Sequence, residues 1–235
     1  MRQKLILLIM AISTILFSGC GEFSNVSFNA EMNKNINKIA VIPPLKETKI
    51  NIFYFNHPGM NFGLIGSVVA LAEFDSKEKS YNKLIESEKF DANSYFIEKL
   101  KGYLENDKYS INLLPVENKE KFKFLKTYPE ADADAYLDLL CSVGYIAGSP
   151  TSTYKPTVKL KVRLVKKIDK TIIYDKMIAI GENYGLDQNV EYIGCEDNSC
   201  YSDFSKLKEN PKQSIDGLKI SLDKIAYHVA NSLKK

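Results

Sequence analysis

The stretch TVKLKVRLVK at residues 157–166 places an apolar side chain at every second position. Its apolar members are Val158, Leu160, Val162 and Leu164, and its basic members are Lys159, Lys161 and Arg163. Alternation with a period of two is typical of a β-strand that buries one face and exposes the other. The segment therefore predicts a sheet with an apolar face turned to a core and a basic face turned to water.

Two neighbouring segments extend this prediction. AYLDLLCSVGY at residues 135–145 alternates in the same way, and IIYDKMIAI at residues 172–180 is a further β-prone run. A loop at 148–153 and a tight turn at 168–171 join the three segments. Short connections suit antiparallel neighbours, so an antiparallel meander is expected over about residues 133–182.

The flanking segments predict the remaining elements. Strands are expected at residues 38–42, 50–55 and 109–114, and helices at 62–72, 91–105, 117–127 and 211–233. Asp91 suits the N-cap of the second helix, and Phe90 and Tyr95 suit a hydrophobic staple. Apolar residues recur every three or four positions in the last helix. The expected fold is α+β, a mixed sheet with an antiparallel meander packed against two or three helices.

Residues 62–72 are the most apolar part of the chain after the leader. A buried core helix is the favoured interpretation, and a docking surface or insertion into a membrane are the alternatives. The segment is too short to cross a bilayer, which needs about 20 apolar residues.

The N-terminus has the pattern of a secretory leader. Arg2 and Lys4 precede an apolar run at residues 5–17, and the small residues Ser18 and Gly19 precede Cys20. A basic head, a short apolar core and small residues at the cleavage site are the marks of a signal peptide. The phrase LFSGC at residues 16–20 resembles the lipobox of bacterial lipoproteins.

The resemblance to the lipobox implies a location in the cell envelope and a lipid anchor. Cys20 would become the mature N-terminus and carry a diacylglycerol and a further acyl chain such as palmitate. Gly21 in place of Asp implies the periplasmic face of the outer membrane. The expected organisation is a signal peptide at 1–19, a lipidated N-terminus with a flexible tether at 20–37, and one α+β domain at 38–235.

A second resemblance concerns the body of the protein. ADAYLD at residues 133–138, followed by Gly144, Tyr145 and YKP at 154–156, resembles a pattern of uncharacterised envelope lipoproteins. More loosely, the body is similar to assembly lipoproteins of the curli-secretion type. These resemblances imply a membrane and other envelope proteins as partners, and they are compatible with an oligomer.

The charge balance and the missing motifs narrow the range of possible functions. Of the 32 basic side chains two lie in the leader, which leaves 30 against 29 acidic ones and gives no case for nucleic acid. The sequence has no phosphate-binding loop or zinc-protease motif, and we expect no cofactor and no enzyme activity. The expected function is a non-enzymatic binding or assembly component. The alternative is a periplasmic carrier of a lipid or other apolar ligand, held between the 62–72 helix and the sheet.

The other cysteines are Cys141, Cys195 and Cys200. In an exported protein two nearby cysteines usually pair, so a disulfide between Cys195 and Cys200 is expected. Free thiols and half of a metal site are the alternatives. Cys141 is expected to be a small buried apolar side chain.

No residue is assigned as catalytic or as a metal ligand. Asp132, Asp134 and Asp138 form the densest carboxylate cluster, and pairing with Lys159, Lys161 and Arg163 is favoured over acid–base chemistry. His57 lies in an expected turn and is a weak site candidate. His228 is expected at the edge of the last helix.

Overall fold

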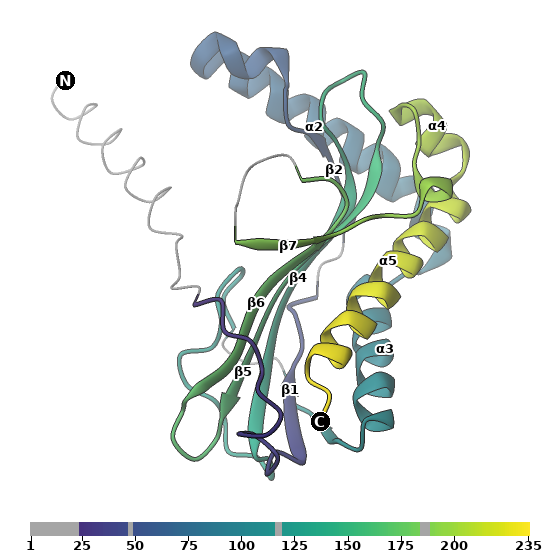
Figure 1. The fold of residues 1–235 in the computed structure, drawn as a ribbon. Coiled ribbons are helices and arrows are strands. Elements are labelled where there is room, and N and C mark those ends of the chain that lie inside the picture. The colour runs from purple at the N-terminus through teal and green to yellow at the C-terminus, as the bar shows by residue number, and fades with distance from the viewer. Residues whose placement is uncertain (1–23, 47–48, 116–118, 184–188) are drawn as a thin grey trace, which may run out of the picture.

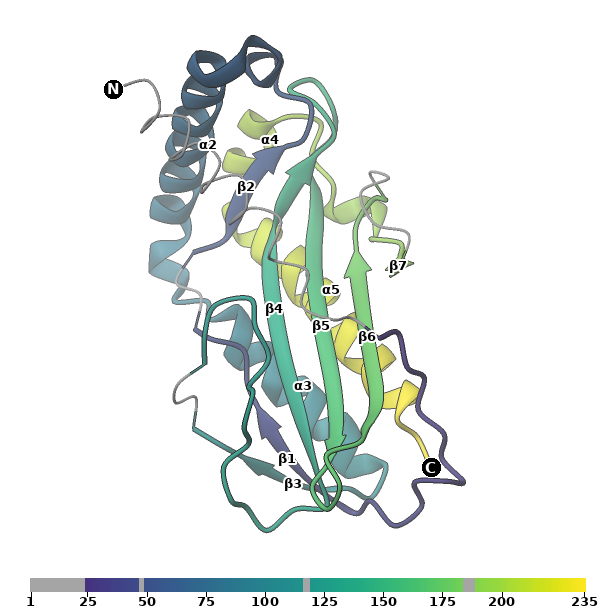
Figure 2. The same ribbon diagram turned by 90° about the vertical axis from the view of Figure 1, so that its left-hand side faces the viewer.

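The structure is a computed structural model that describes residues 24–46, 49–115, 119–183 and 189–235. It confirms the α+β class: the described residues form a seven-stranded mixed sheet with helices packed against one face (Figures 1 and 2). The leader and Cys20 lie outside the described residues.

The antiparallel meander is confirmed at the centre of the sheet. β4 (Ala135–Ala147), β5 (Lys155–Lys166) and β6 (Ile172–Ile180) pair in that order. The remaining pairings are parallel: β1 (Lys38–Ile42) and β2 (Asn51–Tyr54) join β4, β3 (Ser110–Leu113) joins β1, and β7 (Val190–Ile193) joins β6.

Helices α3 (Ala92–Asn106) and α5 (Pro211–Ser232) cover one face of the sheet (Figure 1). The apolar rows of β4 and β5 meet the apolar stripe of α5 in one core. Asp91 caps α3 by accepting a bond from the Ser94 amide, and the rings of Phe90 and Tyr95 lie 6.2 Å apart. The capping and stapling predictions are therefore confirmed.

Helix α2 (Gly63–Ile85) runs beside β2, and α4 (Phe204–Glu209) precedes α5. Three short 3-10 helices complete the list: η1 (Pro58–Phe62), η2 (Glu86–Glu88) and η3 (Asp197–Ser199). The opposite face of the sheet, here called the open face, carries Asp138, Arg163 and Asp175 and is turned to the viewer in Figure 2.

The strand beside β4 is split in two. β1 pairs with β4 at residues 135–138, and β2 pairs with β4 at residues 144–147. Pro43 and Pro44 follow β1 directly, and proline has no amide with which to continue a ladder. Residues 139–143 of β4 therefore face the β1–β2 connection instead of a strand, and we call this position the sheet gap.

The predicted helix at 117–127 is wrong over its described part. Residues 119–127 form a turn and extended chain across the open face. The side chain of Lys119 enters the sheet gap and the amide of Leu125 binds Asp138. These tertiary contacts hold the chain in a path that a helix could not follow.

The segment at 20–37 differs from the expected tether over its described part. The amide of Ser24 and its hydroxyl both bind Asp175, and Val26 forms an antiparallel bridge with the same residue. Phe28 and Ile36 pack against the core. Residues 24–37 are thus held against the folded body by polar and apolar contacts together.

Candidate binding site

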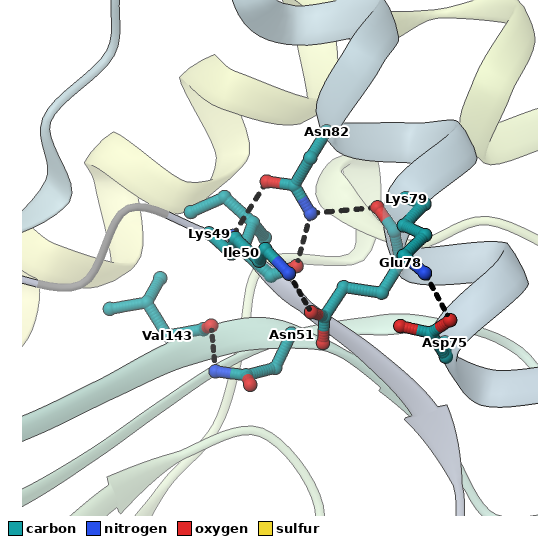
Figure 3. Close-up of polar contacts among 8 residues, drawn as sticks. All are labelled: Lys49, Ile50, Asn51, Asp75, Glu78, Lys79, Asn82 and Val143. Carbon is teal, nitrogen blue, oxygen red and sulfur yellow. Dashed lines mark hydrogen bonds and ion pairs between the residues drawn. The ribbon is translucent and has the colours of Figure 1, made fainter. Parts of the chain in front are cut away.

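Side chains fill the sheet gap where a strand is missing. The Lys119 ammonium donates to the Leu139 carbonyl at 2.6 Å and to the Pro43 carbonyl at 3.0 Å. The Asn51 amide donates to the Val143 carbonyl at 2.9 Å (Figure 3). These bonds satisfy buried carbonyls of β4 that would otherwise carry a desolvation cost.

Asn82 fixes α2 to the beginning of β2. Its side-chain oxygen accepts from the Ile50 amide, and its nitrogen donates to the Ile50 carbonyl, both at 2.8 Å (Figure 3). The side chain thereby makes the same two-way exchange that a neighbouring strand would make. This exchange positions the second half of α2 beside the sheet gap.

Two neighbouring cavities lie around this junction. The first, of about 440 Å³, opens between α2, η2 and the start of α3. The second, of about 580 Å³, lies over Leu140 and Cys141 in the sheet gap. Both volumes are within the range of small-molecule sites, and Lys49 lines both cavities.

The first cavity is basic with an apolar floor. Its lysines are Lys49, Lys79, Lys83 and Lys89, against a single acid, Glu86. Lys79 pairs with Asp75 at 2.6 Å, and Lys49 lies 3.7 Å from Glu78 (Figure 3). Within the described ranges, neither Lys83 nor Lys89 forms an ion pair. With Phe90 and Ile85 nearby, the cavity suits an anionic group attached to an apolar body.

His57, the weak candidate of the sequence, belongs to a separate polar cluster. Its side chain is buried, stacks on Tyr54, and places Nε2 3.0 Å from Glu73 Oε2. The Gly59 amide donates to Nδ1 at 2.8 Å. Since Nδ1 accepts, the ring proton lies on Nε2 and points to Glu73. Both ring nitrogens are engaged, so His57 has no free position for proton transfer to a substrate.

Glu73 is the centre of that cluster. Its Oε1 accepts from Tyr54 at 2.9 Å and lies 2.9 Å from the Lys77 ammonium. Hydrogen bonds from Lys77, then from His57 and Tyr54, lower the pKa of Glu73 to about 2. The cluster joins β2, η1 and α2 and is best explained as a stabilising junction.

The three candidate carboxylates are not brought together. Asp138 is fully buried and bound to Lys119 at 2.7 Å and to the Leu125 amide at 2.8 Å. Asp132 pairs with Lys38 at the surface, and Asp134 accepts from two backbone amides.

The predicted pairing of these carboxylates with Lys159, Lys161 and Arg163 is wrong. Asp138 lies opposite Arg163 in the register, but Arg163 binds Asp175 at 2.8 Å. Burial lowers the pKa of Lys119, while Asp138 opposes that shift. Asp138 has no free oxygen with which to act as an acid or base.

The sulfur atoms of Cys195 and Cys200 lie 3.7 Å apart, and both residues are free thiols in the structure. Burial raises the pKa of the Cys200 thiol to about 12, which leaves it protonated at neutral pH. The disulfide stays a prediction, and mass spectrometry of exported protein without reductant would test it. Cys141 is buried in the core.

The first half of α2 differs from the favoured interpretation as a buried core helix. Val68, Val69 and Leu71 are 66, 59 and 60% exposed, whereas Ala70 is fully buried. The helix therefore rests on a narrow face that includes Ala70 and presents an apolar surface to solvent. We call Val68, Val69 and Leu71 the α2 ridge.

Sequence reasoning missed Lys119, Glu73, Asn82 and Asp175. Lys119, Asn82 and Asp175 are single polar residues that take partners distant in the sequence, and no periodic signal identifies them. Glu73 pairs locally with Lys77 at i,i+4, but its contacts with Tyr54 and His57 come from another element. His228 lies beside Glu191 at 2.9 Å, at the edge of α5 as expected. Over the described ranges no group of three metal-ligating side chains is found, and no helix there has the length and apolarity to cross a membrane.

No protein-family model and no curated protein matches the sequence. Among solved structures, a Xanthomonas campestris protein of family DUF330 is similar over 89% of this chain and 85% of its own, at 9% identity and a TM-score of 0.38. A Helicobacter pylori homologue of neuraminyllactose-binding hemagglutinin is similar over 92% and 91%, at 13% identity and a TM-score of 0.34. Likenesses at this level transfer no ligand, activity or residue to this chain.

Proposed function

We propose that the protein is a non-enzymatic lipoprotein of the cell envelope, anchored through Cys20 at the periplasmic face of the outer membrane, that binds another envelope protein. The observation that carries the binding role is the α2 ridge. Its three large apolar side chains are more than half exposed and lie within four consecutive residues of one helix. Clustered exposed apolar side chains mark interaction surfaces, whereas single ones do not.

The anchor is tested by labelling cells with a clickable fatty acid. Wild-type protein should carry the label and sediment with membranes, and Cys20→Ala should lose both properties. Labelled protein in the Cys20→Ala variant would overturn the assignment of the anchor.

The binding surface is tested by photo-crosslinking in the native envelope with a crosslinker placed at Val68. A reproducible adduct is expected, and Val69→Lys with Leu71→Lys should weaken its yield about tenfold, the effect of losing about 1.4 kcal/mol. Tyr227→Lys, an exposed position on α5, is the matched control and should leave the adduct unchanged. A yield that is equal in all variants would contradict the role of the ridge.

A second candidate function is carriage of an amphiphilic ligand in the first cavity. Lys83 and Lys89 would bind its anionic group, while Phe90 and Ile85 would contact its apolar part. This modifies the expected carrier, since the cavity lies at the second half of α2 and not at residues 62–72.

Native mass spectrometry of gently purified protein tests the carrier. A bound ligand is expected in wild type, reduced by Lys83→Ala with Lys89→Ala and unaffected by Lys208→Ala on α4. Ligand-free wild-type protein would exclude the carrier and leave the proposed protein-binding role standing.

A further inference from the structure

The described chain begins at the β6 edge of the sheet, where Val26 pairs with the backbone of Asp175 and Ser24 lies on the side of the open face. The Ser24 hydroxyl donates to Asp175 Oδ2 at 2.7 Å, and the Ser24 amide donates to the same oxygen at 3.2 Å. Asp175 also binds Arg163 on that face. Helices α3 and α5 lie on the opposite side of the sheet (Figure 1). The described chain therefore starts from the open-face side of the β6 edge.

The covalent distance from Cys20 to this point is short. Only three residues separate Cys20 from Ser24. A fully extended chain spans at most about 3.6 Å for each residue, so the two α-carbons are within about 14 Å of each other. A lipid on Cys20 would therefore hold the open face close to the bilayer surface.

A loop on the same face exposes an aromatic side chain. Residues 119–126 are fixed to the open face because the Leu125 amide binds Asp138 and the Arg163 guanidinium lies 4.4 Å from the centre of the Phe124 ring. Phe122 projects from this loop with 64% of its surface exposed. Its φ of 64° is left-handed, a conformation that residues other than glycine adopt at a cost.

The charges around Phe122 are mostly positive. Lys121, Lys123 and Lys126 are exposed in the loop, and Glu120 is its one acid. Lys159 and Lys161 lie on the open face of β5, in register with Ala179 and Met177 of β6. A basic surface of this kind complements anionic lipid headgroups, and exposed aromatic side chains favour the interface between headgroups and acyl chains.

We propose that the open face docks on an anionic phospholipid bilayer and inserts Phe122 into the interface. This inference rests on the proposed lipid anchor, since the anchor brings the face to the membrane. The α2 ridge belongs to α2, and the first cavity is lined by α2, η2 and the start of α3. Helix α2 runs along one edge of the fold (Figure 2), so both features remain available to a partner or ligand.

The absence of tryptophan from the sequence makes a direct test available. Phe122→Trp introduces a single tryptophan as the reporter into full-length protein purified from membranes with its own anchor. The protein is reconstituted on vesicles of phosphatidylcholine and phosphatidylglycerol, with or without brominated acyl chains that quench nearby tryptophan. Tyr227→Trp, at an exposed position of α5, is the matched control. Flotation of the vesicles measures anchoring separately.

The expected result is at least about twofold quenching for Phe122→Trp, as for a side chain that enters the headgroup boundary by about 5–10 Å. Quenching should be weaker on vesicles of phosphatidylcholine alone, and absent for Tyr227→Trp. Flotation without quenching of Phe122→Trp, or equal quenching of both reporters, would overturn the docking while the anchor stands. Failure to float would instead remove the anchor and, with it, the docking.

Discussion

Lys119 places its ammonium 2.7 Å from Asp138 Oδ1 at a point where both side chains are fully buried. The same ammonium binds the carbonyls of Pro43 and Leu139, so one cation connects the β1–β2 connection, β4 and the loop over the open face. A buried ion pair is strongly destabilising to break because it leaves a charge without a partner.

Asp138→Ala should therefore lower the free energy of unfolding by about 3–5 kcal/mol, measured by urea denaturation. Asp132→Ala, which removes a surface ion pair with Lys38, should cost at most about 1 kcal/mol. Adding Lys119→Met to Asp138→Ala should recover part of the loss, since the unpaired ammonium is then absent. If Asp138→Ala and Asp132→Ala lowered the stability equally, the buried Lys119–Asp138 pair would not have the predicted stabilising role.

Acid should weaken the His57–Glu73 cluster in a defined pH range. The pKa of Glu73 is lowered from 4.5 to about 2 in the folded state. Its ionised form therefore contributes stability above about pH 4.5, and this contribution is lost as the pH falls toward 2. Because Glu73 is partly exposed, solvent limits the effect to about 1 kcal/mol or less.

Thermal unfolding between about pH 4.5 and pH 2 measures the stability that is lost as Glu73 is protonated. Glu73→Gln should flatten the decline of Tm on acidification, whereas Glu98→Gln, at an exposed position of α3, should follow wild type. A Glu73→Gln profile that is parallel to wild type would show that the cluster does not hold the carboxylate in its charged form.

Two helical glycines should respond in opposite directions to alanine. A Cβ at Gly102 in α3 meets nothing within 4 Å, so Gly102→Ala should stabilise by about 0.4–1 kcal/mol. A Cβ at Gly217 in α5 would lie 2.7 Å from the Tyr145 hydroxyl and 2.9 Å from Ser199 Cβ. Gly217→Ala should destabilise by about 1–3 kcal/mol, as overpacking does. Stabilisation by both changes would exclude the close contact of α5 with β4.

Asn82 offers a test of the junction beside the first cavity. Asn82→Ala removes both bonds to Ile50 and should cost about 1–3 kcal/mol. Hydrogen exchange of the Ile50 amide should accelerate accordingly, while Ser80→Ala at an exposed position of α2 should leave it unchanged. Unchanged protection in Asn82→Ala would mean that the two-way exchange does not hold β2.

The sequence could predict the elements whose stability comes from periodic burial. The meander, α3 and α5 follow from repeated apolar positions, and the cap at Asp91 follows from local chemistry. The loop at 119–127 could not be predicted, because Lys119 and Leu125 take their partners from β4. The attachment of Ser24 to Asp175 was also hidden, since a polar segment without periodicity is indistinguishable from a tether until its partner is known.

The candidate site was hardly visible in the sequence for the same reason. The lysines of the first cavity come from the β1–β2 connection, α2 and the residue after η2, and only the fold gathers them. The apolar character of residues 62–72 was clear, but its orientation was not. Ala70 and its neighbours supply a narrow face for packing, and this leaves the larger side chains outside.

The division of the strand beside β4 into β1 and β2 imposes an order on folding. β1 and β2 are made early, yet each finds its neighbour on β4 only after residues 135–147 have followed. The chain leaves a ribosome or a translocation channel N-terminus first. Until β4 emerges, the backbone N–H and C=O groups of these two strands that pair with β4 have no partner there. Pairing between distant segments is slow and leaves strand edges exposed in the interval. Holdase chaperones should therefore engage the nascent chain until β4 has emerged.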